Sequence, residues 1–401
     1  MFFFVYTSYG SNLVPMDLSQ ILFQLGEENE HYFNAVAPPI VQTSNFSFKT
    51  VAEMRQAQLT EYDTHFYTRG NNPVVEMVRK KMAALEGAED ALVLASGSAA
   101  ISVAVLSNLQ HGDHIISVYA PYSWTNKFLT AFLPRFGITV TMVDGTDISN
   151  FKEAIRPETK VIFLESPNSY TFVLQDIAQV SLLAKEHNIT TILDNSYAGP
   201  LFQNPIKMGV DIVVHSATKY IGGHSDAMGG VICGRSDMMR KIFASEYMTL
   251  GGVISPFNAW LLLRGLRTLE VRMDRIADSA AKVTAFLQQH KAVESVRYPF
   301  LPTHPQYDLA KKQMKKCPGL FTIALKASTV DDVELFCNTL KRFALACSWG
   351  GYESLIFPAC ATFEERDMNM EKFNLVRVYV GLENPDLLIE DLAQALQKIK
   401  M

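Results

Sequence analysis

Seven short apolar runs, separated by longer stretches of helical periodicity, occupy the middle of this 401-residue chain. The runs are Ala91–Leu94, His114–Val118, Thr139–Val143, Val161–Leu164, Ile189–Leu193, Asp211–Val214 and Gly229–Cys233. Runs this short, many of them rich in β-branched residues, are typical of strands buried on both faces. Strands that alternate with helices predict an α/β fold, with a mostly parallel seven-stranded sheet and helices on both of its faces.

The pattern changes at Ser255-Pro256, where a hydroxyl N-cap and a proline predict the start of a long helix that continues past Gly265. The segment that follows mixes strand and helix patterns, including strand candidates at 320–325 and 374–380 and a last helix that starts at Asn384-Pro385. A chain of this length exceeds one ordinary core. We therefore expect an α/β domain over 70–255 and a smaller α+β domain over 256–401, joined by a linker helix.

Composition excludes several classes of protein. The net charge of −5 and the scattered lysines and arginines argue against nucleic-acid binding. No uncharged apolar run approaches the roughly 18 to 20 residues of a membrane span. The five cysteines form no CxxC pair, which favours free thiols in a reducing cytoplasm and no metal site. The apolar start, Met1–Tyr6, is too short for a signal peptide and is expected to be a plain tail, and Met16 is an alternative start.

Polar side chains follow two of the predicted strands where each strand ends. Asp194 ends one buried run, and Ser216, Thr218 and Lys219 follow the next. The carboxyl ends of such strands form the ligand-binding edge of an open α/β sheet. A lysine, a buried carboxylate and two hydroxyls supply what pyridoxal phosphate (PLP) needs: an amine for an imine, a partner for the ring nitrogen, and phosphate donors. Taken singly, the lysine could lie on an ordinary loop and the aspartate could cap a helix.

Two further strand ends add to this prediction. Gly97 and Ser98 open a helix after a strand, so their amides could hold a phosphate, although such small-residue turns are common. The GxGxxG and Walker A patterns are missing there, which disfavours a dinucleotide or a triphosphate. Tyr122 follows another strand and could stack on a cofactor ring or move a proton, or be an ordinary core tyrosine.

The second domain contributes candidates for the substrate. Arg377 lies on a strand of core residues, where a guanidinium suits either an amino-acid carboxylate or a structural salt bridge with equal odds. Ser348 and Trp349 begin a glycine-rich, aromatic loop typical of pocket walls, though the tryptophan could equally be buried core.

These residues together resemble the Cys/Met-metabolism family of fold-type I PLP enzymes. The resemblance runs from Pro38-Pro39-Ile40-Val41 to Gly381-Leu382-Glu383. The motifs that carry it are Leu85-Glu86-Gly87-Ala88, Glu165-Ser166-Pro167, Asp194-Asn195-Ser196-Tyr197 and Ser216-Ala217-Thr218-Lys219-Tyr220.

The resemblance implies a role for each candidate. Lys219 forms the imine with PLP and Tyr122 stacks on the ring, and these two share the catalytic proton transfers. Asp194 pairs with the ring nitrogen, and the phosphate is bound by Gly97, Ser98, Ser216 and Thr218. Arg377 and Ser348 hold the substrate carboxylate, beside Trp349. Residues 1–69 form an arm that brings Tyr67 and Arg69 into a neighbouring subunit's site, in a homotetramer built from two dimers.

Within the family, the chain most resembles the bacterial cystathionine β-lyases, mainly in Ser348-Trp349-Gly350-Gly351-Tyr352 and His224-Ser225-Asp226-Ala227-Met228. We therefore expect β-elimination of L-cystathionine to homocysteine, pyruvate and ammonia, in methionine biosynthesis. Departures such as Tyr122-Ser123-Trp124 leave cystathionine γ-synthase and methionine or cystathionine γ-lyase as alternatives. A PLP-fold binding protein without turnover and a non-PLP reductase are weaker alternatives.

Overall fold

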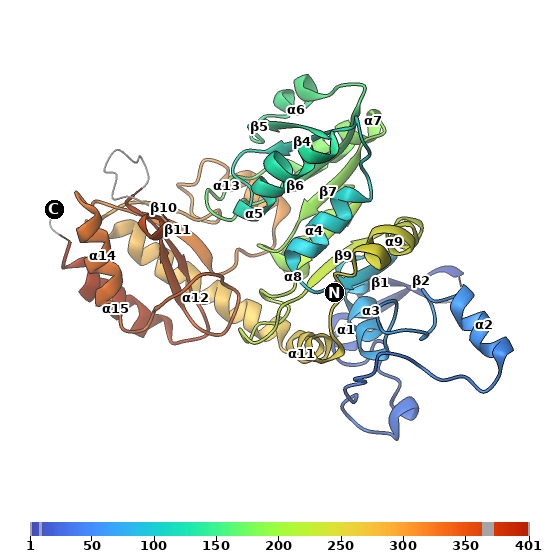
Figure 1. The fold of residues 1–401 in the computed structure, drawn as a ribbon. Helices are drawn as coiled ribbons and strands as arrows, with labels where there is room; N and C mark the ends of the chain where they lie inside the picture. The colour runs from blue at the N-terminus through green and yellow to red at the C-terminus, as the bar shows by residue number, and fades with distance from the viewer. Residues whose placement is uncertain (1, 8–9, 363–372, 400–401) are drawn as a thin grey trace.

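The computed structural model describes residues 2–7, 10–362 and 373–399. Figure 1 shows a large α/β part and a smaller part built around a second sheet, with α11 and α12 running between them. No helix in the described part of the chain has both the length and the apolar character needed to cross a bilayer.

The large domain is built on a seven-stranded sheet in the order β3-β9-β8-β7-β6-β4-β5. All of its pairings are parallel except those of β9, which runs antiparallel to both of its neighbours. The strands are β3 (Asp90–Leu94), β4 (His114–Val118), β5 (Thr139–Val143), β6 (Thr159–Glu165), β7 (Thr190–Asp194), β8 (Ile212–Ser216) and β9 (Gly230–Gly234). The predicted α/β fold with a mostly parallel seven-stranded sheet is confirmed.

Two hydrophobic cores lie on the two faces of this sheet. Along β7 and β8, Leu193 and Val213 belong to one core, whereas Ile192 and Val214 belong to the other. Side chains alternate between the faces of a strand, so runs that are apolar throughout are buried on both sides. Helix α3 (Pro73–Glu86) covers one face and α4 (Gly97–Leu106) the other.

The ends of α3 are set by residues next to them in the sequence. Asn72 caps α3 by accepting from the Val74 N–H, and Gly87 ends it in the left-handed conformation at φ 69°. The remaining helical segments of this domain are α5 (Ser123–Lys127), η2 (Phe128–Phe132), η3 (Leu133–Phe136), α6 (Ile148–Ala154), α7 (Ile177–Glu186), α8 (Gly199–Phe202), η4 (Pro205–Met208), α9 (Ser236–Ile242), η5 (Phe243–Tyr247) and α10 (Met248–Leu250).

The linker is two helices, which corrects the prediction of one long helix past Gly265. Ser255 caps α11 (Pro256–Leu266) as expected, but the chain breaks before α12 (Leu269–Gln289). The Gly265 carbonyl accepts hydrogen bonds from the Arg272 guanidinium (2.7 Å) and the Thr268 hydroxyl (3.2 Å). The Thr268 backbone N–H also donates to this carbonyl, at 3.1 Å. The Gly265 carbonyl is therefore satisfied by a tight turn and by side chains instead of a continued α-helix, and the first helix ends there.

The smaller domain contains a five-stranded sheet in the order β10-β11-β14-β13-β12. Its strands are β10 (Val293–Arg297), β11 (Leu320–Leu325), β12 (Ala344–Leu345), β13 (Leu355–Pro358) and β14 (Leu375–Tyr379). Its helical segments are α13 (Tyr307–Gln313), α14 (Val330–Thr339), η6 (Ala359–Thr362) and α15 (Pro385–Leu396). The α+β character expected for 256–401 is therefore present, and the exact domain limits stay a prediction.

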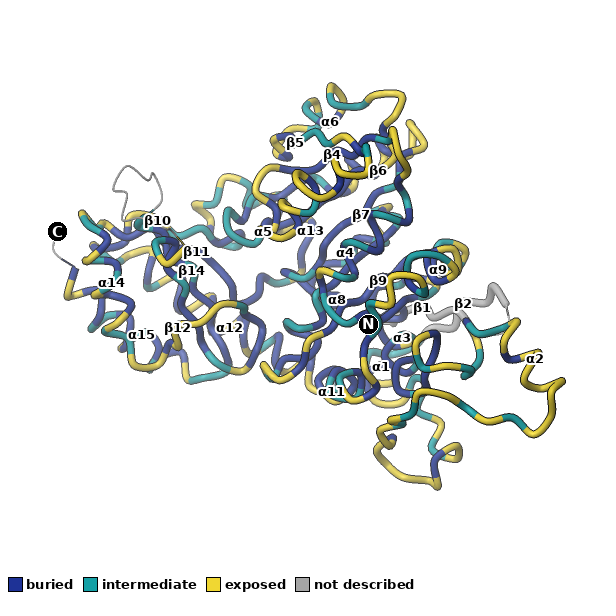
Figure 2. The backbone as a smooth tube through the Cα atoms, in the orientation of Figure 1, coloured by how far each residue is buried: buried dark blue, intermediate teal, exposed yellow. Residues whose placement is uncertain are grey.

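The N-terminal region differs from the expected plain tail, because β1 (Phe2–Thr7) and β2 (Gly10–Asp17) pair as an antiparallel hairpin. The hairpin leads into α1 (Leu18–Phe23), followed by η1 (Asn29–Tyr32) and α2 (Val51–Leu59). Buried Lys81 anchors α1, since its Nζ donates to the Ile21 and Leu22 carbonyls at 2.9 and 3.2 Å. Figures 1 and 2 show the segment around α2 projecting from the large domain with most of its residues exposed.

Candidate active site

The carboxyl ends of β6, β7 and β8 lie side by side and carry the polar residues of the candidate site. Glu165 of β6 is in register with Asp194 of β7, which in turn is opposite Val214 of β8. Ser216 ends β8, and the turn that follows holds Lys219. The fold thus brings Asp194, Ser216 and Lys219 to one edge of the sheet, as the sequence predicts.

Lys219 is held between two residues of the smaller domain. Its Nζ donates to the Ser348 Oγ at 2.5 Å and lies 5.1 Å from the centre of the Trp349 ring. Burial, reinforced by the positive charge of Arg377, lowers the pKa of Lys219 to about 8. A lysine with this pKa is partly neutral near physiological pH and can act as a nucleophile or a base.

The approach of the loop to Lys219 depends on glycine. Gly350 has φ 92°, and a Cβ at this position would lie 2.8 Å from the Lys219 Cα. Ser348 is also left-handed at φ 76°, which is uncommon for a residue with a side chain. Trp349 is 7% exposed and packs on Tyr220 with ring centres 5.3 Å apart. The loop therefore packs against the lysine, and Trp349 belongs to the main hydrophobic core, while its role as a pocket wall stays a prediction.

A second buried carboxylate, Glu165, lies beside Asp194, and sequence reasoning assigned no role to it. Burial raises the pKa of Asp194, and burial together with the neighbouring charge of Asp194 raises the pKa of Glu165 to about 7. Glu165 accepts the backbone N–H groups of Tyr122 (2.7 Å) and Ser169 (2.8 Å). It thereby fixes the start of the loop that carries Tyr122, whose ring is 41% exposed.

Small residues lie where the sequence predicts a phosphate cradle. Gly97 packs so closely on Ser216 that an added Cβ would lie 2.7 Å from the Ser216 Cβ. Ser96 caps α4 by accepting from the Ala99 N–H, and the N–H groups of Gly97 and Ser98 have no acceptor in the described part of the chain. Thr218 differs from the expectation of a free donor, because its hydroxyl already bonds the Gly229 backbone.

Arg377 has no carboxylate partner among the described residues. Its guanidinium lies between two rings, 5.2 Å from the centre of Phe357 and 5.8 Å from that of Tyr170. Burial lowers the pKa of Arg377. The structural salt bridge that the sequence left open is therefore not seen among the described residues, and a half-buried cation without an anion is suited to an anionic ligand.

Tyr67 and Arg69 lie apart from these groups. Both are exposed, and the Arg69 guanidinium lies 5.6 Å over the Tyr67 ring. Within residues 10–362 and 373–399, no hydrogen bond or ion pair joins either one to Lys219 or to the phosphate cradle. Their action in a neighbouring subunit's site stays a prediction.

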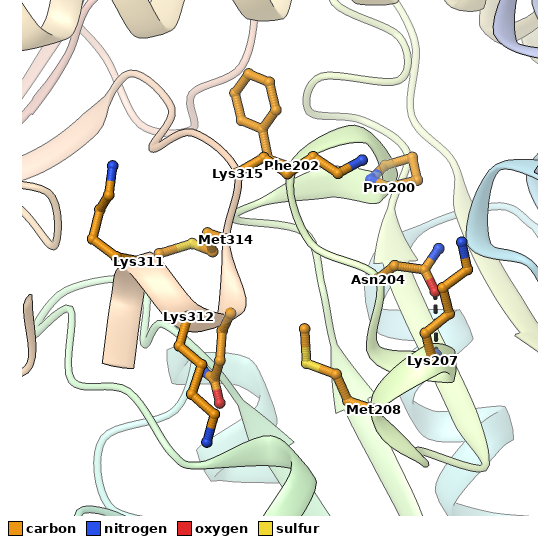
Figure 3. A pocket seen from close by; sticks show the side chains of 10 residues that line it. Pro200, Phe202, Asn204, Lys207, Met208, Lys311, Lys312, Met314 and Lys315 are labelled. Atoms are coloured by element: carbon orange, nitrogen blue, oxygen red, sulfur yellow. Dashed lines mark hydrogen bonds between the residues drawn. The ribbon is translucent and has the colours of Figure 1, made fainter. Parts of the chain in front are cut away.

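A pocket of about 390 Å³ is separate from this edge of the sheet. Figure 3 shows it between the α8–η4 segment and α13, with Met208 and Met314 pointing into the space. None of the predicted site residues lines it. The lining residues are Pro200, Phe202, Asn204, Lys207, Met208, Lys311, Lys312, Gln313, Met314 and Lys315.

The residues at the strand ends fit PLP. The amine of Lys219 has a lowered pKa, and the buried carboxyl of Asp194 accepts the Ser196 N–H at 2.9 Å but forms no ion pair with another described residue. The Gly97 and Ser98 amides at the start of α4 have no acceptor in the described chain. In the described ranges, no group of three or more His, Cys, Asp or Glu residues could hold a metal ion. The fold and these strand ends together define a PLP-dependent α/β enzyme.

Comparison with known proteins places the chain within this class. Residues 19–397 match the family model described as "Cys/Met metabolism PLP-dependent enzyme". The chain belongs to that family, and its cofactor is pyridoxal 5'-phosphate.

The relatives named in these comparisons are lyases of sulfur amino acids. An L-methionine gamma-lyase of Treponema denticola is 39% identical over 92% of this chain and 94% of its own length. A cystathionine gamma-lyase of Macaca fascicularis is 36% identical over 93% and 92%. Among solved structures, the crystal structure of metB from Corynebacterium glutamicum superposes with a TM-score of 0.89 at 32% identity, covering 95% of this chain and 98% of that one. The protein is therefore a PLP-dependent member of this lyase family.

Proposed function

We propose that the protein cleaves L-cystathionine by β-elimination, taking up water and releasing homocysteine, pyruvate and ammonia. The observation that carries this proposal is the position of Trp349, whose ring lies 5.1 Å from the Lys219 Nζ while Ser348 bonds the same atom. Expulsion from the β-carbon requires one proton to be removed, from Cα. Expulsion from the γ-carbon also requires removal of a Cβ proton, so the base has to serve two carbons. Ser348 and Trp349 hold Lys219 closely. A base held in this way favours β-elimination, because that reaction requires proton removal at one carbon only.

Each residue has a physical task in this reaction. Bound PLP supplies an electron sink that acidifies the Cα proton of the substrate. Arg377 binds the substrate carboxylate by charge-assisted hydrogen bonds and so orients Cα toward Lys219. Lys219 removes the Cα proton, because its lowered pKa provides a neutral amine. Asp194 would pair with the ring nitrogen of bound PLP, whose positive charge would favour the ionised carboxylate, and Tyr122 would share in the proton transfers.

Elimination from the γ-carbon is the second candidate, because the relatives reported above are named gamma-lyases. Such an enzyme would convert L-cystathionine to cysteine, 2-oxobutyrate and ammonia. A γ-synthase would instead join an activated homoserine to cysteine. The resemblance supports β-elimination here, because tryptophan at 349 is typical of cystathionine β-lyases, whereas γ-synthases and methionine γ-lyases usually have leucine at this place.

Product analysis tests the proposal. The holoenzyme is incubated with L-cystathionine, and pyruvate, 2-oxobutyrate and the released thiol are quantified. We expect pyruvate and homocysteine in equal amounts. Trp349→Leu should increase the share of 2-oxobutyrate, whereas Trp349→Phe, which keeps an aromatic face at the lysine, should retain the wild-type ratio. Cysteine and 2-oxobutyrate as the main wild-type products would contradict the proposal.

We further propose that the enzyme works in the cytoplasm, in methionine biosynthesis, as a homotetramer in which Tyr67 and Arg69 complete a neighbouring site. The exposure of both residues and the projection of the segment around α2 support this arrangement (Figure 2). Light scattering coupled to gel filtration measures the assembly. Mixing Arg69→Ala with Lys219→Ala subunits should restore activity in hybrid sites, whereas the absence of such complementation would contradict shared sites.

A further inference from the structure

Tyr170 lies where the two domains meet at the substrate side of the site. It belongs to the loop after β6, only five residues beyond Glu165. Its ring nevertheless packs against Ala324, Ala359 and Leu375 of the smaller domain. A residue of the large domain thus contacts the sheet that carries Arg377.

The hydroxyl of Tyr170 is buried and has no hydrogen-bond partner in the described chain. Burying a polar group without a partner is unfavourable, and such groups are rare in folded proteins. The Arg377 guanidinium lies 5.8 Å from the centre of the Tyr170 ring, and its positive charge opposes the rise in the pKa of Tyr170 that burial causes. The ring that carries the unsatisfied hydroxyl and the unpaired guanidinium are therefore neighbours.

We infer that Tyr170 is a substrate-binding residue whose hydroxyl donates a hydrogen bond to the carboxylate paired with Arg377. This inference rests on the proposed function, in which Arg377 binds the α-carboxylate of an amino acid. A carboxylate has about four lone-pair sites, so it can accept two bonds from the guanidinium and a third from the phenol. Tyr170 thereby helps the site to select amino acids over simple amines.

The test compares two ligands that differ in the carboxylate. Holoenzyme is titrated with L-alanine and with ethylamine, and binding is followed by the change in absorbance of the bound cofactor. Tyr170→Phe keeps the ring and its packing but removes the hydrogen-bond donor. We expect the dissociation constant of this variant for L-alanine to rise about five- to tenfold, which corresponds to the usual contribution of one hydrogen bond. Its affinity for ethylamine should stay within about twofold of the wild type on the same grounds.

Two controls accompany the titration. Tyr307→Phe, a matched change on α13 away from the site, should alter neither affinity. Arg377→Lys should weaken the binding of L-alanine but not the binding of ethylamine. Unchanged L-alanine binding in Tyr170→Phe would overturn the inference, as would equal weakening of both ligands, which indicates a structural defect. Because L-alanine has no leaving group, the titration gives its answer even if the enzyme fails to cleave L-cystathionine.

Discussion

Replacing Glu165 with glutamine should change how the stability of the cofactor-free protein depends on pH. The pKa of Glu165 is raised from its ordinary 4.5 to about 7. Between these values the folded protein holds a proton that the unfolded chain has released, so the wild type loses stability as the pH rises through this window. A rise of this size corresponds to about 3 kcal/mol, and the coupling of Glu165 to Asp194 makes the effect of Glu165 alone smaller.

Glutamine does not titrate, so the Glu165→Gln variant should not show the loss of stability that the wild type shows as the pH rises. The amide retains one acceptor oxygen, and one of the two backbone donors from Tyr122 and Ser169 loses its partner, at about 1 to 3 kcal/mol that does not vary with pH. The measurement is urea unfolding of both proteins at about pH 5 and about pH 8.5, with Glu186→Gln on the exposed side of α7 as control. For each pH, the free energy of unfolding of the wild type is subtracted from that of the variant. If the two differences agree within about 0.5 kcal/mol, the reasoning is refuted.

Three further outcomes follow from the site. The rate at which cofactor-free protein takes up PLP should rise about tenfold per pH unit and level off above about pH 8, because imine formation needs neutral Lys219, whose pKa is about 8; stopped-flow absorbance measures it. Arg377→Lys should raise KM for L-cystathionine about tenfold or more with a smaller change in kcat, because an ammonium cannot bind a carboxylate in two parallel bonds. Lys219→Ala should abolish the visible absorption of bound PLP, and a retained band would show that another residue anchors the cofactor.

The seven-stranded sheet could be predicted from the sequence because most of its strands are buried on both faces. Such burial favours runs that are mainly apolar, and small polar turns such as Ala95-Ser96 mark where they end. The edge strand β5 is the exception, since most of its residues are partly exposed. The linker break could not be predicted in this way, since Leu266 and Leu269 continue the apolar pattern across it. The break depends on Arg272, whose contact with the Gly265 carbonyl is a tertiary interaction.

In the candidate site, too, some residues could be predicted from the local sequence, whereas others depend on tertiary contacts. Lys219 and Asp194 could be found because a charged residue at the end of an apolar run is conspicuous. Glu165 ends a run in the same way, but its contacts with Tyr122 and Ser169 depend on how three loops meet. Tyr170 gave no signal, because an isolated tyrosine in a loop is common and its neighbours Ala324 and Leu375 are remote in the sequence. The N-terminal hairpin was missed because Gly10-Ser11-Asn12 resembles a loop.

The antiparallel strand β9 also determines when the site can form during synthesis. Strand β3 joins the sheet only through β9, although the two are separated by more than a hundred residues. The phosphate cradle at Gly97 follows β3 directly, and it meets Ser216 of β8 only once β9 lies between them. A ribosome-bound chain that ends before Gly230 therefore exposes two unpaired strand edges and has no complete PLP site. PLP can therefore stabilise the large domain only after β9, the last strand of its sheet, has left the ribosome.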